Sequence, residues 1–126
     1  MATLTPNGDA EVTIADRGQL TTSEVQDTAA SGAPITLTQT VPVGKVWILK
    51  RQATLANGSH TLRLTTFQDP VTALKVEIDR NESPSNAEQV DLKGYTLTAG
   101  WRILTDFYTT GSSLQQSILL YQEYDA

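Results

Sequence analysis

The sequence contains no cysteine and only one histidine, His60, and these two shortages remove several kinds of site. Disulfide bonds and thiolate metal sites need cysteine, so neither can form. A zinc site would have to combine His60 with three carboxylates, which is a rare ligand set. A Ser–His–Asp triad would also depend on His60, and the sequence has no Gly-x-Ser-x-Gly turn to present a serine. We therefore expect no catalytic residue, no metal site and no cofactor, and we expect His60 to be a solvated residue beside a turn.

Basic residues are also few. The chain has 9 Lys and Arg against 14 Asp and Glu, which gives a formal net charge of −5. The basic residues are scattered along the sequence, whereas binding to a phosphate backbone requires several of them on one surface. We therefore expect neither nucleic acid nor an anionic membrane as a partner.

Long apolar runs are missing as well. No stretch approaches the roughly 20 apolar residues that a membrane-spanning helix needs. Residues 1–10 contain neither the basic region nor the apolar stretch of a secretory signal. We expect no transmembrane segment and no signal peptide.

What the sequence does have is threonine and a repeated alternation of apolar and polar residues, both typical of β-strands. The alternation is strongest after residue 34. Ile35 and Leu37 alternate with threonines, and Leu74, Val76 and Ile78 alternate with charged residues. The second of these patterns is the most regular in the chain, and it predicts a strand whose three aliphatic side chains face the core.

Two further segments predict how their strands are covered. The run Val46-Trp47-Ile48-Leu49 is apolar at every position, which is typical of a strand covered on both faces. Between residues 60 and 67, the pattern favours Leu62 and Leu64 pointing inward and Arg63 pointing outward.

Turn signals separate these strands at intervals of roughly ten residues, a spacing typical of an antiparallel sandwich or barrel. The strongest signals are Val41-Pro42-Val43-Gly44, Asn57-Gly58, Asp69-Pro70, Ala99-Gly100 and Gly111-Ser112-Ser113. The connections are too short for parallel βαβ units. A chain of 126 residues is long enough for one domain with its own core. We predict an all-β antiparallel sandwich of seven to eight strands over residues 34–126.

Residues 1–33 differ from the rest. They include Pro6, Asn7-Gly8 and a small, polar stretch at residues 28–32, and their two short alternating pieces hold too few apolar residues for a core. We interpret residues 1–33 as an extended N-terminal arm that packs on a neighbour, with a disordered tail as the alternative.

Four carboxylates, Asp79, Glu82, Glu88 and Asp91, flank a polar loop at residues 79–87. Oxygen ligands beside a loop could hold calcium, but the spacing does not match an EF-hand. Carboxylates on solvated strand ends explain the pattern equally well.

The aromatic residues allow two interpretations. They could form a platform that stacks against sugars, but such residues are more often part of a core or a subunit interface. We expect Trp47 in the core, because it lies within an apolar strand. Tyr121 and Tyr124 lie near the C-terminus and are better candidates for exposed contacts.

One group of motifs resembles a known class of proteins. The turn Val41-Pro42-Val43-Gly44-Lys45 leads into an apolar strand, Asn57-Gly58-Ser59 follows, and Leu97-Thr98-Ala99-Gly100 precedes the penultimate strand. A final strand at residues 114–123 ends close to the C-terminus. This order of turns is similar to that of small structural proteins of tailed viruses. Trp101 departs from the pattern, because a polar residue often follows the glycine in those proteins.

The resemblance covers residues 34–123, and it implies a jelly-roll-like fold and a place in a virion. Proteins of this class decorate or cement capsids, form turrets, or serve as tail and baseplate accessories. It therefore implies a non-enzymatic protein that docks on the shell as a homo-oligomer, a trimer or a pentamer, with the major capsid protein or other virion proteins as partners. The alternative is a tail or baseplate module that binds a host-surface glycan. A capsid-surface protein would need no secretory signal.

We expect the contacts to involve the predicted arm and three aromatic residues. The candidate interface residues are Leu4, Val12, Ile14, Leu20, Trp101, Tyr121 and Tyr124.

Overall fold

The computed structural model describes residues 19–29, 34–56, 60–82, 84–109 and 113–126. Within these ranges the chain forms nine β-strands. The same ranges contain no helix that is long and apolar enough to cross a membrane. The strands are β1 (Gln19–Ala29), β2 (Pro34–Thr40), β3 (Lys45–Ala56), β4 (His60–Gln68), β5 (Lys75–Asn81), β6 (Ala87–Asp91), β7 (Thr96–Thr98), β8 (Arg102–Thr109) and β9 (Ser113–Asp125).

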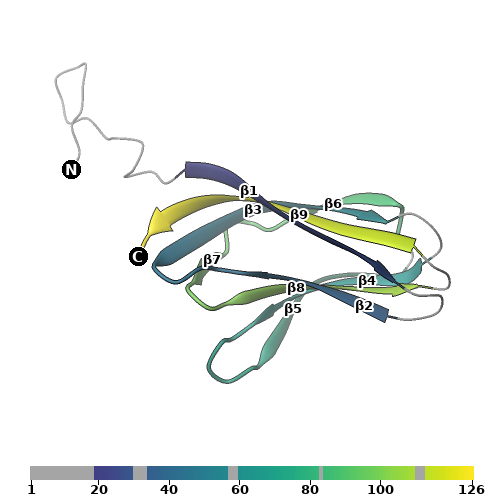
Figure 1. Cartoon of the computed structure of the whole chain (residues 1–126), viewed down its shortest axis with the longest axis horizontal. Helices are drawn as coiled ribbons and strands as arrows, with labels where there is room; N and C mark the ends of the chain where they lie inside the picture. The colour runs from purple at the N-terminus through teal and green to yellow at the C-terminus, as the bar shows by residue number, and fades with distance from the viewer. Residues whose placement is uncertain (1–18, 30–33, 57–59, 83, 110–112) are drawn as a thin grey trace, which may run out of the picture.

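The strands form two antiparallel sheets that face each other (Figure 1). In the first sheet, the order is β1-β9-β3, and both β6 and β7 pair with the free side of β3. Because β6 pairs with residues 51–55 and β7 with residues 46–48, the two behave as halves of one edge strand. The second sheet has the order β2-β8-β4-β5. With β6 and β7 counted as one edge strand, the two sheets hold eight strand positions, and this strand order is that of a jelly roll, which confirms the predicted fold class.

A β-bulge in β3 sets which side chains enter the sandwich. The register against β9 shifts between Leu49 and Arg51, so Lys50 is an extra residue. Trp47 and Leu49 point inward before the bulge, and Gln52 points inward after it. Every inward side chain in the second half of β3 therefore occupies an even-numbered position.

The interior contains two apolar clusters. The larger cluster includes Trp47, whose ring stacks on that of Tyr121 with 3.9 Å between centroids and 23° between planes. The indole Nε1 of Trp47 donates a hydrogen bond of 2.9 Å to Glu123. The smaller cluster contains Leu37, Ala56 and Phe107. The prediction that Trp47 belongs to the core is confirmed.

The expected orientation of β4 is wrong. Arg63 points inward and is only 3% exposed, whereas Leu62 and Leu64 are partly exposed on the other side. The side chains of a strand alternate between two faces, and Phe67 and Thr65 anchor the odd-numbered face in the interior. Arg63 is on the same face as Phe67, so the strand alternation directs its side chain inward in spite of its charge.

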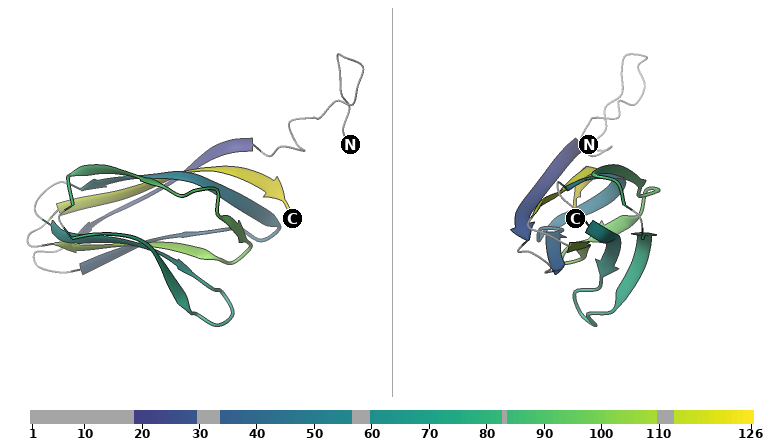
Figure 2. Two further views of the ribbon diagram at one scale, coloured as in Figure 1. Left: turned by 180° about the vertical axis from the view of Figure 1, so that it is seen from behind. Right: turned by 90° about the vertical axis from the view of Figure 1, so that its right-hand side faces the viewer.

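The apolar face predicted for residues 74–78 is also wrong in part. Ile78 packs against the larger cluster, but Leu74 and Val76 are exposed. The reason is the place of β5: it is an edge strand, and the β4–β5 hairpin projects beyond the rest of the sandwich (Figures 1 and 2). Alternation alone does not distinguish an edge strand from a covered one.

Residues 19–29 of the segment expected to be an arm form β1, the edge strand of the first sheet. β1 pairs with β9 along its whole length, from Gln19 opposite Glu123 to Ala29 opposite Ser113. Residues 1–18 and 30–33 of the predicted arm lie outside the described residues.

Replacing Trp47 with alanine tests the core assignment. We expect Trp47→Ala to lower the free energy of unfolding by roughly 3–5 kcal/mol, because it removes a buried ring and leaves a cavity. The matched control is Val43→Ala, at an exposed turn position, which should change stability by less than about 0.5 kcal/mol. Urea unfolding followed by fluorescence measures both; a loss below about 1 kcal/mol for Trp47→Ala would show that the ring is not part of the core.

Candidate functional site

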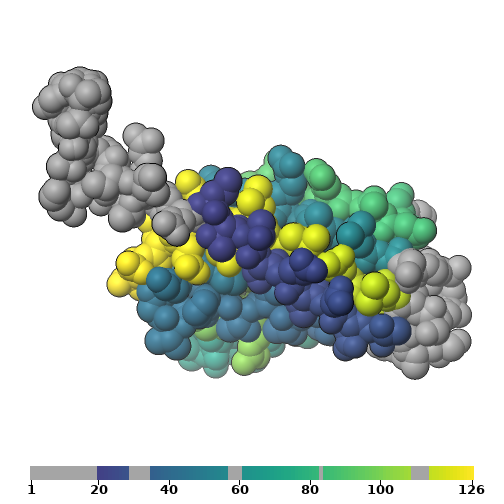
Figure 3. All heavy atoms as spheres, turned by 45° about the horizontal axis from the view of Figure 1, so that its top comes forward, coloured from purple at the N-terminus to yellow at the C-terminus, as the bar shows by residue number. Residues whose placement is uncertain are grey.

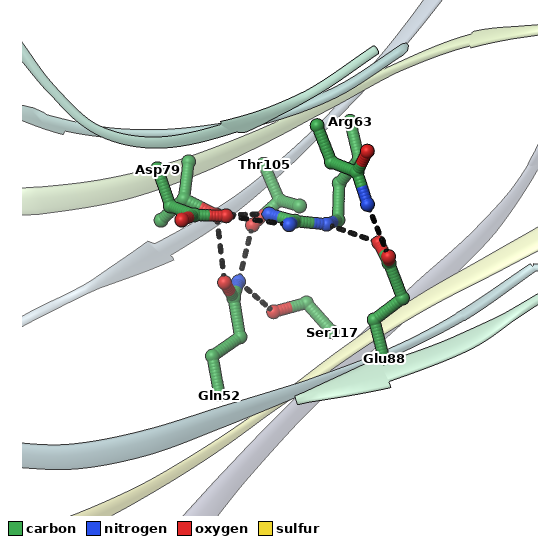
Figure 4. A network of polar contacts seen from close by, with 8 residues as sticks. Gln52, Arg63, Asp79, Glu88, Thr105 and Ser117 are labelled. Atoms are coloured by element: carbon green, nitrogen blue, oxygen red, sulfur yellow. Dashed lines mark hydrogen bonds and ion pairs between the residues drawn. The ribbon is translucent and has the colours of Figure 1, made fainter. Parts of the chain in front are cut away.

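Two of the four carboxylates that flank the polar loop, Asp79 and Glu88, converge on the buried guanidinium of Arg63 (Figure 4). Asp79 on β5 lies 2.5 Å from Nη2 of Arg63, and Glu88 on β6 lies 2.7 Å from Nε. The second carboxylate oxygen of Glu88 accepts a hydrogen bond from the side chain of Asn81. A buried guanidinium needs such partners, because an unpaired charge in the interior is very costly.

This pairing engages two of the four carboxylates that suggested calcium. The Arg63 guanidinium occupies the position between Asp79 and Glu88 that a cation would take. Glu82 instead faces Arg80 at 3.8 Å, and Asp91 accepts the backbone N–H of Lys93 at 2.8 Å. Across the described ranges, no three His, Asp or Glu side chains come together to hold a metal ion.

The Arg63 cluster is one end of a polar network that crosses the interior. Arg63 donates to the hydroxyl of Thr65 at 3.3 Å, and that hydroxyl donates to Oε1 of Gln52 at 2.7 Å. Nε2 of Gln52 donates to Thr105 at 2.7 Å and to Ser117 at 2.9 Å. One glutamine side chain therefore joins β3 to β4, β8 and β9.

The network continues to the opposite edge of the sandwich. The hydroxyl of Ser117 donates to Oε1 of Gln39 at 2.9 Å, and Nε2 of Gln39 donates to the backbone oxygen of Ser23 at 2.9 Å. We call the buried members of this network the polar belt. They are Gln39, Gln52, Arg63, Thr65, Thr105 and Ser117.

The polar belt lies between the two apolar clusters. On β8, the inward residues run Ile103, Thr105, Phe107, so a polar residue separates the larger cluster from the smaller. The belt is built of amides, hydroxyls and a paired guanidinium whose hydrogen bonds are made within the protein. Such a network specifies how strands align, because shifting a strand by one residue would leave buried groups without partners. We interpret the belt as structural and look for function on the surface.

A catalytic role for His60 stays an untested alternative. Its backbone belongs to β4 and lies opposite Thr109 of β8. Its side chain lies outside the described residues, as do the predicted contact residues Leu4, Val12 and Ile14.

The remaining predicted contact residues lie in different environments. Leu20 is exposed on β1, Trp101 is partly buried against the larger cluster, and Tyr124 is partly buried on the outer side of the first sheet. Tyr121 is 4% exposed, so the expectation of an exposed contact is wrong for it. Its stacking on Trp47 places it in the core. Burial raises the pKa of the Tyr121 hydroxyl above its ordinary value, and the charge of Glu123 adds to that effect.

An exposed aromatic pair in a concave site would favour the glycan alternative. The stacked pair of the structure, Trp47 with Tyr121, is buried, and exposed Tyr95 packs edge-on against Phe67 with 5.5 Å between centroids. Neither of these two aromatic pairs in the described residues therefore has both rings exposed, and glycan binding stays a prediction.

Three aliphatic side chains project into solvent from turns at one end of the sandwich. Val43 in the β2–β3 turn is 93% exposed, and Val71 and Leu74 in the β4–β5 turn are 89% and 69% exposed. Their turns meet through the β7–β8 turn, because Gly100 donates to the backbone oxygen of Val41 at 2.9 Å and packs against Pro70. We call Val43, Val71 and Leu74 the turn surface.

The β4–β5 part of the turn surface is fixed by its own hydrogen bonds. Oδ1 of Asp69 accepts the backbone N–H of Val71 at 2.7 Å and of Thr72 at 3.2 Å. The backbone of Asp69 also exchanges hydrogen bonds with Ala73 and Leu74, at 3.0 and 2.9 Å. Ala73 has a φ of +62°, a conformation that alanine seldom adopts and that these bonds hold in place. The exposed side chains are therefore presented from an ordered loop.

The β2–β3 part is tied to the end of the chain. Gly44, with a φ of +80°, accepts the backbone N–H of Ala126 at 2.8 Å. Lys45 lies 2.6 Å from Asp125. The hydrogen bond and the charge of Asp125 raise the pKa of Lys45 above its ordinary value, and Lys45 lowers the pKa of Asp125 by the same two effects. Both groups are exposed, so this pair contributes little to stability.

The outer side of the first sheet is a second surface with aliphatic side chains, and these are half-buried. The outward residues of β9 from Gln116 to Tyr124 are all uncharged, and they include Ile118 and Leu120. Val46 and Ile48 of β3 lie beside them. We call this surface the outer face; Figure 3 shows this side of the molecule, with β1 in purple and β9 in yellow. A solvated sheet face is usually polar, so aliphatic residues along its two central strands are unusual.

Comparison with models of known protein families and with curated proteins finds no match to this chain. The fold, the turn surface and the outer face are thus the basis for a functional proposal.

Removing the buried cation tests the Arg63 cluster. We expect Arg63→Gln to lower the free energy of unfolding by about 3 kcal/mol, because Glu88 and Asp79 are then left facing each other without their shared partner. The matched control is Arg80→Gln, which removes an exposed guanidinium that pairs with Glu77 on the same edge of the sandwich. Urea unfolding at neutral pH should show a much smaller loss for Arg80→Gln; equal losses would contradict a buried role for Arg63.

Proposed function

We propose that this chain is a non-enzymatic structural protein of a virion, which docks on a protein shell through its turn surface and acts as a homo-oligomer. The observation that supports docking is the turn surface itself: three aliphatic side chains, two of them at least 89% exposed, held outward by ordered turns. Isolated exposed apolar residues are common, but three on neighbouring turns at one end of a domain favour an interaction site.

The physical basis of docking is burial of these side chains in an apolar depression of the partner. Each fully buried aliphatic side chain contributes about 1.5–3 kcal/mol. The loop that carries Val71 and Leu74 is already ordered by Asp69, so binding spends little free energy on ordering it. The gross contribution of three side chains is modest for one copy.

A repeated shell makes such a weak contact sufficient. Copies that associate with each other bind many equivalent sites at once, so the second and later contacts are intramolecular and much more favourable. The net charge of −5 keeps the free protein soluble and disfavours non-specific association with polyanions. The major capsid protein or another virion protein is the partner that this proposal implies, with the capsid surface as the location and the tail as the alternative.

A binding assay with virus particles tests the proposal. Purified chain is added to particles that lack it, prepared from a deletion mutant of the virus whose genome encodes the chain, and the two are co-sedimented. We expect the wild type to sediment with the particles, and the double variant Val71→Ser/Leu74→Ser to bind at least about tenfold more weakly, because two apolar contacts are lost.

The matched control is Thr38→Ser/Thr40→Ser, a double substitution at exposed positions of edge strand β2. It should bind as the wild type does, and circular dichroism should show that both variants keep the fold. A wild type that stays in the supernatant, or a turn-surface variant that binds as tightly as the control, would overturn the proposal.

A further inference from the structure

Two consecutive basic side chains project from the same side of β3. Residues of a strand alternate between its two faces, so neighbours such as Lys50 and Arg51 would ordinarily point in opposite directions. The bulge removes the alternation at this one place. Leu49 and Gln52, on either side of the pair, are fully buried, and both Lys50 and Arg51 are exposed on the outer side of the first sheet. The sandwich therefore presents two cations together.

A third basic residue, Lys93, belongs to a turn that is bonded to β3 at the bulge. Leu92 donates its backbone N–H to the oxygen of Lys50 at 3.0 Å, and Gly94 donates to the oxygen of Leu49 at 2.9 Å. Lys93 has a φ of +55°, a conformation that lysine seldom adopts. Residues held in such conformations cost free energy and cluster at functional sites.

These three cations form no ion pair with another described residue, whereas Arg63 pairs with two carboxylates. One carboxylate, that of Asp91, lies opposite Arg51, and its Oδ1 accepts the backbone N–H of Lys93 at 2.8 Å. Three positive charges and one negative charge leave a local excess of two positive charges. This excess lies on a chain whose net charge is −5.

An open hollow of about 380 Å³ lies against the two strands that carry these charges. It is lined by Lys50 and Arg51 of β3 and by Gln89, Val90 and Asp91 of β6. Ammonium, guanidinium and amide groups are all hydrogen-bond donors. The hollow thus offers both positive charge and donors to an anion that enters from solvent.

We propose that this hollow binds a phosphate group, either as inorganic phosphate or as a small phosphate monoester. We call Lys50, Arg51, Gln89, Asp91 and Lys93 the bulge site. A phosphate monoester carries about 1.5 to 2 negative charges at neutral pH, which matches the local excess, whereas a carboxylate carries only one. The planar guanidinium of Arg51 can bind two phosphate oxygens at once, and Lys50 adds a point charge.

The same charges disfavour a long polyanion. A nucleic acid requires a row of basic residues along its backbone, but the bulge site has three cations on a molecule with an excess of acidic residues. A compact dianion makes its contacts within the hollow and avoids the rest of the surface. The proposal goes beyond docking on a shell and does not depend on the turn surface.

Titration of the isotope-labelled full chain with inorganic phosphate, followed by nuclear magnetic resonance at constant ionic strength, is the first test. We expect the amide signals of Lys50, Arg51 and residues 91–94 to shift and saturate, with a dissociation constant of about 1 mM. Acetate carries one charge and should bind at least about tenfold more weakly. Glycerol 3-phosphate distinguishes the two sources, because tighter binding than phosphate assigns the site to a monoester and weaker binding assigns it to the free ion.

A pair of double variants tests which cations bind the anion. Lys50→Gln/Arg51→Gln should weaken phosphate binding at least about tenfold, because it removes both charged donors that line the hollow. The matched control Lys75→Gln/Arg102→Gln removes two exposed cations from the second sheet, so both variants lose two positive charges. The control should bind phosphate as the wild type does, and circular dichroism should show that both variants keep the fold.

The variant Asp91→Asn should have the opposite effect. Asparagine retains an Oδ1 that can accept the backbone N–H of Lys93, but it removes the one negative charge of the bulge site. We expect phosphate to bind about threefold more tightly, because the repulsion between this carboxylate and the anion is lost. A purely structural role for Asp91 would not produce a gain in affinity.

Each contrary result would overturn the inference. If phosphate produces no saturable shift, the bulge site is a solvated set of charges. Equal losses in the two double variants would mean that phosphate is attracted without a defined site, and acetate that binds as tightly would mean that the charge match is wrong. A larger response to a single-stranded DNA oligonucleotide than to phosphate would assign these cations to a polyanion.

Discussion

The structure depends on the hydrogen bonds of one buried amide, that of Gln52. This side chain joins strands of both sheets at the middle of the sandwich, through Thr65, Thr105 and Ser117. A buried polar group that loses its partner costs more than a hydrogen bond gains, so the alignment of these strands is strongly constrained. The bulge at Lys50 brings Gln52 into the interior, and it therefore sets which residues of β3 face water.

The two surfaces described above follow from this constraint. Because register is fixed from the inside, Val46 and Ile48 of β3 and Ile118 and Leu120 of β9 face outward. The turn surface depends on the same alignment, because Gly100 joins the β7–β8 turn to Val41 and Pro70. The proposed docking through the turns therefore depends on the same strand alignment as the core.

Periodicity and turn signals were sufficient to predict the all-β sandwich and the core position of Trp47. The burial of Arg63 and Tyr121 was predicted wrongly. Arg63 was expected outside because of its charge, and Tyr121 because it is close to the chain end. The inward place of Arg63 depends on Phe67, and on carboxylates that come from two other strands. The position of β5 at an edge depends on topology, which alternation does not encode. Gln39 and Gln52, polar residues at inward positions, were the signal in the sequence that could have revealed the polar belt.

The free energy of unfolding of Gln52→Leu tests the central claim most directly. Leucine has a similar volume and is more apolar, so a sandwich that depended on apolar burial alone would be unchanged or more stable. Our account predicts a loss of about 2–4 kcal/mol, because three buried hydroxyl groups lose a partner. Gln89→Leu, at an exposed position of β6, serves as the control and should have little effect. A Gln52→Leu protein as stable as the wild type would contradict the claim that the polar belt holds the strands in register.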